Sequence, residues 1–388
     1  MSDGRNDMRI LISPDSYRGV LSVRAVADAI EEGLKRSRLS VSVVKQPVAD
    51  GGEGTVDVLV KHLQGRFVTS SVTGLLGDPI EAKWGLLFDD TTAVIEISAA
   101  SGVETVPASR RDPMLATTYG TGELIRNALD CGCRQILLGL GGSGTIDGGL
   151  GILEALGVRF HDADGQLLPR GGGALSKLET IDANGVDPRI CNGALTVLCD
   201  IDTPIFFDGA SIARMFGPQK GCDADEVTQL ELGFERLISA IKDHCGSMIG
   251  RGLYDGASGG VAGSLRALVG AKLDSGIDTI LSLLRFDELL RTADVVITGE
   301  GKIDRQTLRG KAPLGVIRAA KRFDTPVYCL TGILTDGVSP DDLGCSAPIF
   351  ELPDNHAGTF DPETGYSQIV QTAEKLGDML HNANLRAS

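Results

Sequence analysis

The chain is poor in the side chains that nucleic-acid binding requires. Aromatic residues make up 4% of its 388 residues, and 37 lysines and arginines stand against 52 aspartates and glutamates, which leaves a formal net charge of −15. Proteins that bind DNA or RNA without sequence preference need a basic surface and aromatic stacking platforms. The composition therefore argues against a nucleic-acid partner. An anionic small substrate would need local Lys or Arg to overcome the overall field.

Long apolar runs and paired cysteines are also missing. No stretch approaches the ~18 consecutive apolar residues of a membrane span, and the first eight residues, MSDGRNDM, lack the apolar core of a signal peptide. The eight cysteines form no C-x-x-C pair, and Cys131-Gly-Cys133 is too close for a zinc knuckle. We expect a soluble, cytoplasmic protein with no membrane partner, whose cysteines are small core residues.

Glycine, by contrast, is abundant and clustered. The 51 glycines gather in short segments, which suggests loops where the backbone approaches a ligand closely. A chain of 388 residues also exceeds one ordinary hydrophobic core, so two domains are the natural expectation.

The pattern of apolar residues predicts a β-α-β unit at each end of the chain. Residues 8–13 and 41–48 are expected strands around a helix capped by Ser22, and residues 293–298, 312–321 and 326–330 repeat this order. We infer an α/β fold with a Rossmann-like parallel-sheet domain built from both chain ends, residues 1–70 and 285–388. A second α/β domain, residues 71–284, is inserted between them, and the active site is expected in the cleft between the two.

The inserted part shows a different rhythm. Short strands within residues 67–97, separated by tight turns, predict a meander. Residues 224–243 predict a long amphipathic helix. Its expected inward residues are Leu230, Leu232, Phe234, Leu237, Ile238 and Ile241.

The most glycine-rich segment, residues 139–151, reads GLGGSGTIDGGLG. It holds G-x-G-x-x-G between an expected strand and an expected helix, and Asp162 lies where a ribose-binding carboxylate would be, so an NAD-dependent dehydrogenase of a small hydroxy acid is one interpretation. Asp147 opposes it, because a carboxylate in such a loop repels a pyrophosphate unless a cation lies between them. The other interpretation is a phosphate and Mg²⁺ site.

Several segments share one arrangement, a buried strand that ends in a loop of acids, hydroxyls and glycines. Any one of them would be a solvated turn, but repetition after buried strands weakens that interpretation. In open α/β sheets the carboxyl ends of strands bind ligands, so these loops are expected at one cleft. The segments are residues 13–19, 49–55, 139–151, 199–200 and 298–304.

Such loops suit phosphoryl transfer. Glycine amides bind phosphate oxygens, carboxylates hold Mg²⁺, and a cation neutralises the transferred group. The chain has no P-loop, and none of its five histidines lies in a cluster, which makes aspartate the expected base. Lys220 and Lys311 stand out because glycines border them. A third interpretation, a non-catalytic two-lobed ligand sensor, would not need these repeated loops.

Taken together, these segments resemble the motifs of bacterial glycerate kinases of the glycerate 2-kinase-like type. The match runs in order from about residue 9 to residue 332. The resemblance implies ATP and Mg²⁺, D-glycerate as the acceptor, and phosphoglycerate as the product, more often 2-phosphoglycerate than 3-phosphoglycerate. The matching strings are PDSYRG (14–19), PVADGGEGT (47–55), TTYGTGE (117–123), GGSGTIDGG (141–149), FGPQKG (216–221) and TGEGKIDRQT followed by GK (298–311).

The kinase interpretation places the clustered residues in four roles. The expected catalytic residues are Asp147, Asp200, Lys220 and Arg18. The expected substrate-binding residues are Asp15, Ser16, Asp50 and Lys311. The expected nucleotide-binding residues are Gly141, Gly142, Ser143, Gly299, Glu300 and Gly301, and the expected metal ligands are Asp147, Asp200, Glu300 and Asp304.

A few positions depart from the family pattern. Arg18 keeps the charge of the usual Lys and could grip a carboxylate bidentately. Ile146, in place of Asn, puts an apolar side chain beside Asp147, so either that Asn is structural or the acceptor preference has shifted. The sequence leaves the oligomeric state open, with a homodimer as one option. The remaining departures are Gly144 for Ala, Thr203 for Asn and Leu75 for Pro.

Overall fold

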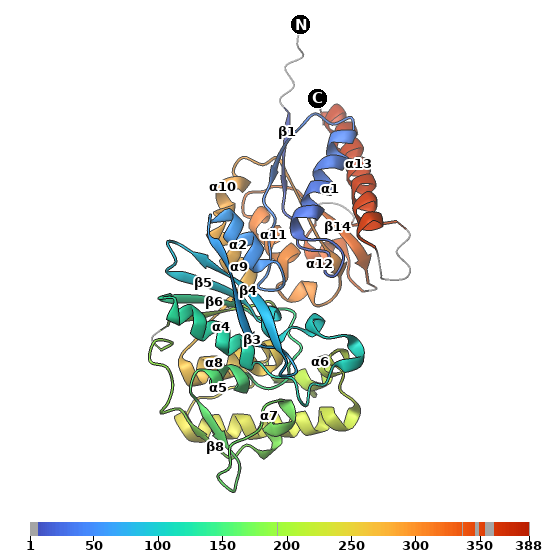
Figure 1. Ribbon diagram of the computed structural model, residues 1–388. Coiled ribbons are helices and arrows are strands. Elements are labelled where there is room, and N and C mark those ends of the chain that lie inside the picture. The colour runs from blue at the N-terminus through green and yellow to red at the C-terminus, as the bar shows by residue number, and fades with distance from the viewer. Residues whose placement is uncertain (1–6, 192, 336, 346–348, 354–360, 388) are drawn as a thin grey trace. The chain divides into compact units, whose positions relative to one another are not determined.

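The structure, a computed structural model, describes residues 7–191, 193–335, 337–345, 349–353 and 361–387 (Figure 1). The chain forms two compact units: unit 1 comprises residues 1–49 and 277–388, and unit 2 comprises residues 50–276. The prediction that no signal peptide is present concerns residues 1–8, and residues 1–6 lie outside the described residues. None of the described helices combines the length and the apolar character that crossing a membrane requires.

Unit 1 is built on a five-stranded parallel sheet in the order β15-β14-β13-β1-β2. Numbered along the unit, this order is 2-1-3-4-5, a doubly wound arrangement with its switch point between β1 and β13. The Rossmann-like sheet from both chain ends is thereby confirmed. The strands are β1 (Met8–Ile12), β2 (Val41–Lys45), β13 (Val295–Ile303), β14 (Val327–Leu334) and β15 (Phe350–Glu351).

The helices of unit 1 bury apolar faces against this sheet and against each other. Ser22 caps the first of them by accepting the Ala25 N–H at 3.3 Å. α1 and α13 lie side by side (Figure 1), and they approach so closely that a Cβ on Gly33 would overlap the Val370 carbonyl. The helices are α1 (Val23–Arg36), α9 (Gly276–Leu283), α10 (Phe286–Leu290), α11 (Ala312–Lys321), α12 (Pro340–Leu343) and α13 (Pro362–Ala387).

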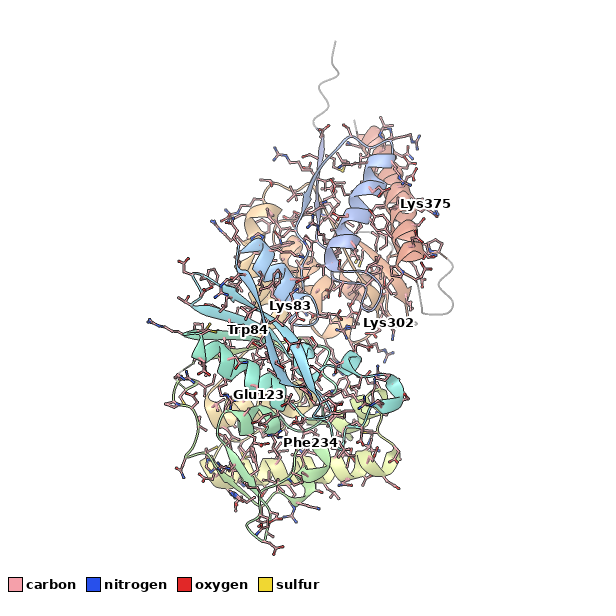
Figure 2. All side chains as sticks on the ribbon, in the orientation of Figure 1. Lys83, Trp84, Glu123, Phe234, Lys302 and Lys375 are labelled. Carbon is pink, nitrogen blue, oxygen red and sulfur yellow. The ribbon has the colours of Figure 1, made fainter. Side chains whose placement is uncertain are left out.

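Unit 2 contains a six-stranded mixed sheet in the order β12-β9-β6-β5-β4-β3. The first four strands in that order run parallel, and the last two continue antiparallel from β5, which confirms the expected meander. Trp84 of β4 is fully buried (Figure 2). The strands are β3 (Arg66–Thr73), β4 (Pro79–Leu87), β5 (Thr92–Glu96), β6 (Gln135–Gly139), β9 (Leu195–Cys199) and β12 (Lys272–Ser275).

Two small antiparallel sheets and seven α-helices are further elements of the described part of unit 2. The small sheets pair β7 (Arg159–His161) with β8 (Thr180–Asp182) and β10 (Phe206–Phe207) with β11 (Ala210–Ser211). The helices are α2 (Thr55–His62), α3 (Ser98–Ser101), α4 (Tyr119–Asp130), α5 (Leu150–Ala155), α6 (Ile212–Lys220), α7 (Ala224–Cys245) and α8 (Ala257–Val269).

The unit boundaries differ from the expected ones at residues 70 and 285. α2 packs on the sheet of unit 2, since a Cβ on Gly85 of β4 would overlap Val60. At the other end, a Cβ on Gly315 of α11 would overlap Ile277, which places α9 with unit 1. Apolar packing of these two helices, which a linear pattern does not reveal, sets the boundaries at residues 49/50 and 276/277.

The long helix α7 occurs as expected, but one of its assigned inward residues was wrong. Phe234 (Figure 2) and Leu237 are fully buried, whereas Leu232 is 54% exposed. With 100° per residue, position 232 lies 200° from Leu230 and therefore on the opposite face. A capping box formed by Asp223 and Glu226 fixes the start of the helix.

Candidate active site

The first candidate cluster lies at the switch point of the unit 1 sheet. The Asp15 N–H donates to the Gly299 carbonyl at 2.8 Å, and the Thr298 hydroxyl donates to the Ser13 carbonyl at 2.8 Å. A Cβ on Gly301 would lie 3.1 Å from Tyr17 Cα, so glycine permits the close approach of β13 to this loop. We call the group formed here the switch-point cluster; it comprises Asp15, Ser16, Arg18, Gly299, Glu300, Gly301, Asp304, Thr307 and Lys311.

Glu300 is one of two buried acids of the switch-point cluster, with Asp15. Its Oε1 accepts the Thr307 hydroxyl at 2.6 Å, and its Oε2 lies 3.8 Å from Lys311 Nζ. Lys311 is the N-cap residue of α11, whose first turn no side chain caps. A helix N-terminus beside a lysine is a favourable place for an anion. Phosphate or carboxylate oxygens therefore have two kinds of donor at this point.

The two aspartates of the switch-point cluster also shape their own loops. Asp15 Oδ1 accepts the Ser16 N–H at 2.6 Å. Asp304 Oδ1 accepts the N–H groups of Gln306 at 2.8 Å and Thr307 at 3.4 Å, and Lys302 Nζ lies 3.3 Å from its other oxygen. These bonds hold both carboxylates in fixed orientations at the end of the sheet.

The second cluster lies at the carboxyl end of the unit 2 sheet, and its glycines contact another loop. A Cβ on Gly139 would overlap the Gly51 carbonyl, and one on Gly141 would overlap Gly52 Cα. The Gly141 N–H donates to the Gly51 carbonyl at 3.1 Å. The first two glycines of G-x-G-x-x-G are therefore required for packing of two backbone segments. We call residues 50–55 and 139–149 together with Asp200 and Lys220 the glycine-loop cluster.

Lys220 is a buried cation in the glycine-loop cluster. It is 6% exposed, and its Nζ donates to Ser143 Oγ at 3.0 Å and to the Thr145 carbonyl at 2.8 Å. Burial lowers the pKa of its ammonium from 10.5 to about 8, and the nearby carboxylates of Asp200 and Asp147 limit the decrease. The side chain from the end of α6 therefore reaches the loop that follows β6, as its flanking glycine suggested.

Asp147 is fully engaged inside the protein. Its Oδ2 accepts the N–H and the hydroxyl of Thr118, both at 2.8 Å, and the Gly151 N–H at 3.4 Å, while Oδ1 accepts the Gly149 N–H at 3.0 Å. It is 1% exposed. Burial raises the pKa of Asp147, and the four donors act against that increase. Four donors thus hold this carboxylate in place, and its expected role as catalytic residue and metal ligand stays a prediction.

Asp50 and Asp200 complete the acids of the glycine-loop cluster. Asp50 is buried, and its Oδ1 accepts the Gly52 N–H at 3.0 Å. Asp200 follows β9, and its Oδ2 would lie 3.4 Å from a Cβ on Gly141. Asp200 is thus the half-buried carboxylate that faces both the glycine loop and the charge of Lys220.

The donor set fits a metal ion that arrives with a ligand better than a resident one. Within the described part of the chain, no three His, Cys, Asp or Glu side chains are arranged to hold a metal ion by themselves. Mg²⁺ is usually held by one or two carboxylates together with substrate phosphates. Asp200 in unit 2, and Glu300 with Asp304 in unit 1, are carboxylates of that kind.

Asp162 does not lie where a dinucleotide site requires it. It follows β7, in a two-stranded antiparallel sheet away from the parallel strands. Its Oδ1 accepts the N–H groups of Asp164 at 3.0 Å and Gln166 at 2.9 Å, so it shapes a turn. Gly139 and Gly141 serve the packing of two loops, and Asp162 shapes a turn. Neither of the two observations that favoured a dehydrogenase therefore remains.

Two of the departures from the family pattern lie in contact. A Cβ on Gly144 would lie 2.8 Å from Leu75 Cδ2 and 3.0 Å from Val103 Cα. Leu75 therefore fills the space that an alanine at position 144 would need. Ile146 is fully buried in the apolar core of unit 2, so its side chain contributes to packing.

Sequence reasoning missed two residues that organise the glycine-loop cluster. Thr118 donates to Asp147 and accepts the Ile152 N–H at 3.0 Å. Glu96 ends β5 and accepts the Val56 N–H at 2.7 Å. The acid-after-strand pattern used for the other loops would have found Glu96, which closes the apolar run 93–95. Thr118 lies in the string TTYGTGE, one of those that carry the family resemblance, but no role was predicted for it.

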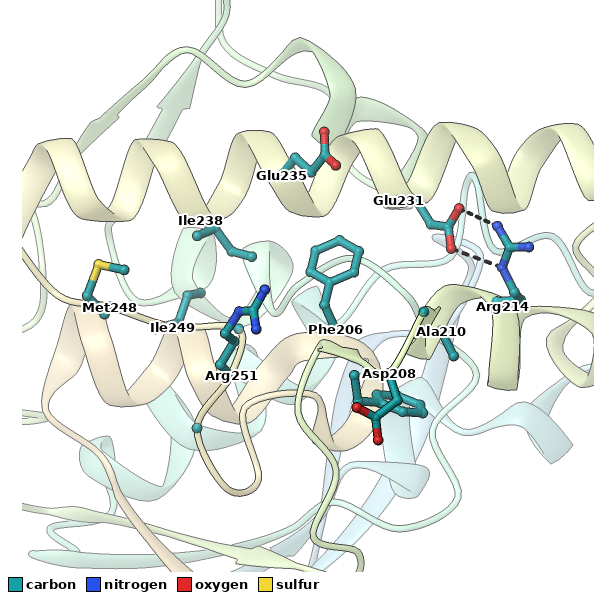
Figure 3. Close-up of a pocket in the computed structure, with 14 residues that line it drawn as sticks. Phe206, Asp208, Ala210, Arg214, Glu231, Glu235, Ile238, Met248, Ile249 and Arg251 are labelled. Carbon is teal, nitrogen blue, oxygen red and sulfur yellow. Dashed lines mark hydrogen bonds and ion pairs between the residues drawn. The ribbon is translucent and has the colours of Figure 1, made fainter.

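A separate cavity of about 740 Å³ lies in unit 2 (Figure 3). Phe206, Ile238 and Met248 form its apolar part, and Arg214 pairs with Glu231 at 2.9 Å at one end. Neither cluster contributes a residue to the lining of this cavity. It therefore does not belong to the candidate site.

The fold and the two clusters define an α/β protein that presents acids, lysines and glycines at the carboxyl ends of parallel strands, the arrangement that binds anionic ligands. The chain belongs to the glycerate kinase family, whose sequence profile matches residues 10–380. The family resemblance is thereby confirmed, and the protein is an enzyme, a kinase of that family.

Individual relatives agree with this membership. A glycerate kinase of Bacillus subtilis is 44% identical over 84% of this chain and 86% of its own length. A glycerate 2-kinase of Escherichia coli is 43% identical over 85% of this chain and 87% of its own. A crystal structure assigned to glycerate kinase 2 of Salmonella typhimurium LT2 matches 98% of this chain and 100% of that one, with a TM-score of 0.79 and 38% identity.

Proposed function

We propose that this enzyme transfers the γ-phosphoryl group of ATP to D-glycerate and releases phosphoglycerate and ADP. The observation that carries the proposal is the ammonium of Lys220, buried within a glycine loop and beside the carboxylate of Asp200. A cation in a dry, preformed loop stabilises the charge that develops on a transferred phosphoryl group. Membership of the glycerate kinase family supports the acceptor.

The C2 hydroxyl is the proposed acceptor atom. The support is the Escherichia coli relative, which is named a glycerate 2-kinase and is 43% identical to this chain. The expected product is therefore 2-phosphoglycerate rather than 3-phosphoglycerate.

The glycine-loop cluster supplies the proposed proton and charge chemistry. Asp200 takes the proton of the glycerate hydroxyl, whose oxygen then attacks the γ-phosphorus while the bond to ADP breaks. Lys220 donates to the oxygens of the transferred group. Ser143 Oγ already accepts from Lys220, so its own hydrogen is directed toward a further acceptor, such as a phosphate oxygen. Asp147 and Asp50 hold the loops in place.

The switch-point cluster supplies the proposed binding groups for the anionic ligands. Lys311 and the first turn of α11 bind phosphate or carboxylate oxygens, and Arg18 adds an exposed guanidinium. The backbone of residues 299–301 and Asp15 with Ser16 are proposed to line the ligand. Their position at the switch point of a doubly wound sheet supports this assignment.

Mg²⁺ is proposed to accompany ATP. Asp200 of unit 2, or Glu300 with Asp304 of unit 1, are the carboxylates that would hold it, and when bound it neutralises charge on the phosphates. Asp147 is left out of this set because four donors already occupy its oxygens.

A product assay tests the proposal directly. Purified protein is incubated with ATP, Mg²⁺ and a panel of small hydroxy acids, ADP is followed, and the product is examined by ³¹P NMR. We expect ADP release with D-glycerate and a phosphorus coupled to the single C2 proton. Coupling to the two C3 protons would change the product to 3-phosphoglycerate, and no ADP above background with D-glycerate would remove the proposed substrate.

A further inference from the structure

Glu96 lies beside the two loops of the glycine-loop cluster, and the proposed mechanism gives this residue no role. It is the last residue of β5, next to Gly139 at the end of β6 in the parallel register. Its Oε1 accepts the Val56 N–H at 2.7 Å, and the Ser98 hydroxyl lies 3.3 Å from its Oε2. The half-buried carboxylate thus links the start of α2 to residues 96–98 at the end of β5.

The first of these bonds replaces a missing helix cap. α2 begins after Gly54, which has a left-handed conformation with φ of 96° and offers no side chain to cap the helix. Its first turn therefore needs an acceptor from elsewhere. Glu96 provides that acceptor from a neighbouring strand, and by doing so it fixes the end of the loop 50–55.

The second bond extends to the glycine loop after β6. Ser98 lies beneath Gly142, because a Cβ on Gly142 would lie 3.3 Å from Ser98 Cβ. The Ile97 N–H also donates to the Gly139 carbonyl at 2.8 Å. Residues 96–98 are therefore in contact with both glycine loops, which themselves touch at Gly51 and Gly141.

We propose that Glu96 is a positioning residue for phosphoryl transfer. It caps α2 from a neighbouring strand and thereby holds loop 50–55 against loop 139–144, where Ser143 and Lys220 would bind phosphate oxygens. This inference rests on the proposed function. Because Glu96 acts through the loops, its loss should lower kcat and change KM much less.

Ionisation of Glu96 should make the order of these loops depend on pH. Burial raises the pKa of Glu96 to about 7, and the carboxylates of Glu53 and Asp57 add to the increase, while the bonds from Val56 and Ser98 oppose it. Asp57 is itself paired with Lys83 at 2.7 Å and lies 3.5 Å from Lys61. The ionised form is the stronger acceptor for the Val56 N–H, so loop order should increase as pH rises through about 7.

Two substitutions separate shape from charge. Glu96→Ala removes the cap, and we expect kcat to fall about 10- to 100-fold, the effect of a small misplacement at a site. Glu96→Gln keeps an acceptor of the same size but cannot ionise. It should therefore lack the rise in kcat that the wild type shows through about pH 7 and keep the kcat of the wild type's acidic plateau, while the change that Lys220 causes near pH 8 is common to both enzymes.

Glu123 (Figure 2) provides a matched control in the same unit. Its Oε2 accepts the Thr73 N–H at 2.7 Å, again from another element, but that bond does not touch loop 50–55 or loop 139–144. Glu123→Ala should lower the melting temperature as Glu96→Ala does, with a kcat within about threefold of the wild type at the assay temperature, as expected for a change that leaves the site in place.

Amide hydrogen exchange makes the inference independent of the substrate. Glu96→Ala should speed exchange in both loops, whereas Glu123→Ala should not. Faster exchange at Val56 alone, or a Glu96→Gln enzyme that keeps the wild-type change in kcat near pH 7, would overturn the inference. If the wild type fails to phosphorylate D-glycerate, the proposed function fails, and the exchange result still decides whether Glu96 joins the loops.

Discussion

Replacing Lys220 with methionine should lower kcat strongly and change the stability of the fold much less. The side chain keeps its length but loses the charge and both hydrogen bonds, to Ser143 Oγ and the Thr145 carbonyl. Loss of one cation or donor from a preformed, partly dry site typically costs ~2.7–4 kcal/mol of transition-state stabilisation, about 10²- to 10³-fold in kcat. We expect that decrease in ADP release at pH 7 with D-glycerate.

Stability should change far less, because two effects of similar size oppose each other. Holding the pKa of Lys220 at about 8 instead of 10.5 disfavours the fold by roughly 3 kcal/mol at neutral pH, at ~1.36 kcal/mol per pH unit. Methionine removes this penalty. It also leaves Ser143 Oγ and the Thr145 carbonyl without their donor, at a cost of about 1–3 kcal/mol each.

The two opposing effects depend differently on pH, so the melting temperature measured against pH can separate them. Below pH 8 the lysine is charged in both states, and the burial penalty is fully present. Between pH 8 and 10.5 the folded form has released a proton that the unfolded form still holds, so wild-type stability gains from rising pH. The melting temperature of Lys220→Met relative to wild type should therefore fall over this range.

The control for this experiment is Lys177→Met, the same change at an exposed lysine of unit 2. It should alter neither kcat nor the pH dependence of the melting temperature. Wild-type kcat and KM in Lys220→Met would refute the role of the buried ammonium. An unchanged difference in melting temperature between pH 8 and 10 would refute the lowered pKa.

Three further predictions concern neighbouring groups. Asp147→Asn should lower stability by about 1–3 kcal/mol, because an amide N–H would face one of its four donors, whereas Asp162→Asn should change thermal melting and turnover little; equal melting temperatures would contradict the positioning role. Turnover should cease in excess EDTA and return with Mg²⁺, and full activity in EDTA would count against metal-assisted transfer. Gly144→Ala should destabilise the fold by roughly 1–3 kcal/mol through overlap with Leu75, and Leu75→Ala should recover part of that loss; strictly additive effects in thermal unfolding would show that the two positions do not interact.

Most strands of the two sheets could be predicted from the sequence because each carries its own signal, whereas β12 and β15 were not predicted. The runs at 8–12, 195–199 and 295–298 are mostly apolar and are followed by serine, aspartate and glycine. Both the strand and the loop at its carboxyl end can therefore be predicted from the local sequence. The pairing of N- and C-terminal strands followed from the repeated β-α-β order. The unit boundary could not be read in this way, because it depends on which sheet buries α2 and α9.

The sequence predicted which residues gather in the two clusters more readily than the bonds that each side chain makes there. Lys220 was found because glycine flanks it, and its contact with the glycine loop agrees with that reasoning. Asp147 looked the same as Asp200 in the sequence, since both follow buried strands. Only the fold shows that Thr118, Gly149 and Gly151 surround the first with donors, while the second faces Lys220.

The segment GLGGSGTIDGGLG illustrates why a glycine motif alone cannot identify a ligand. A glycine is required wherever a Cβ has no room, and the sequence does not say whether a ligand or another part of the chain takes that room. At Gly139 and Gly141 the space belongs to loop 50–52, at Gly144 to Leu75, and at Gly149 to Val261. The groups that remain for a phosphate are the hydroxyl of Ser143 and the ammonium of Lys220. The proposed chemistry therefore depends on Ser143 of this loop and on Lys220 of α6, and the glycines of the loop bring Ser143 to the end of the sheet.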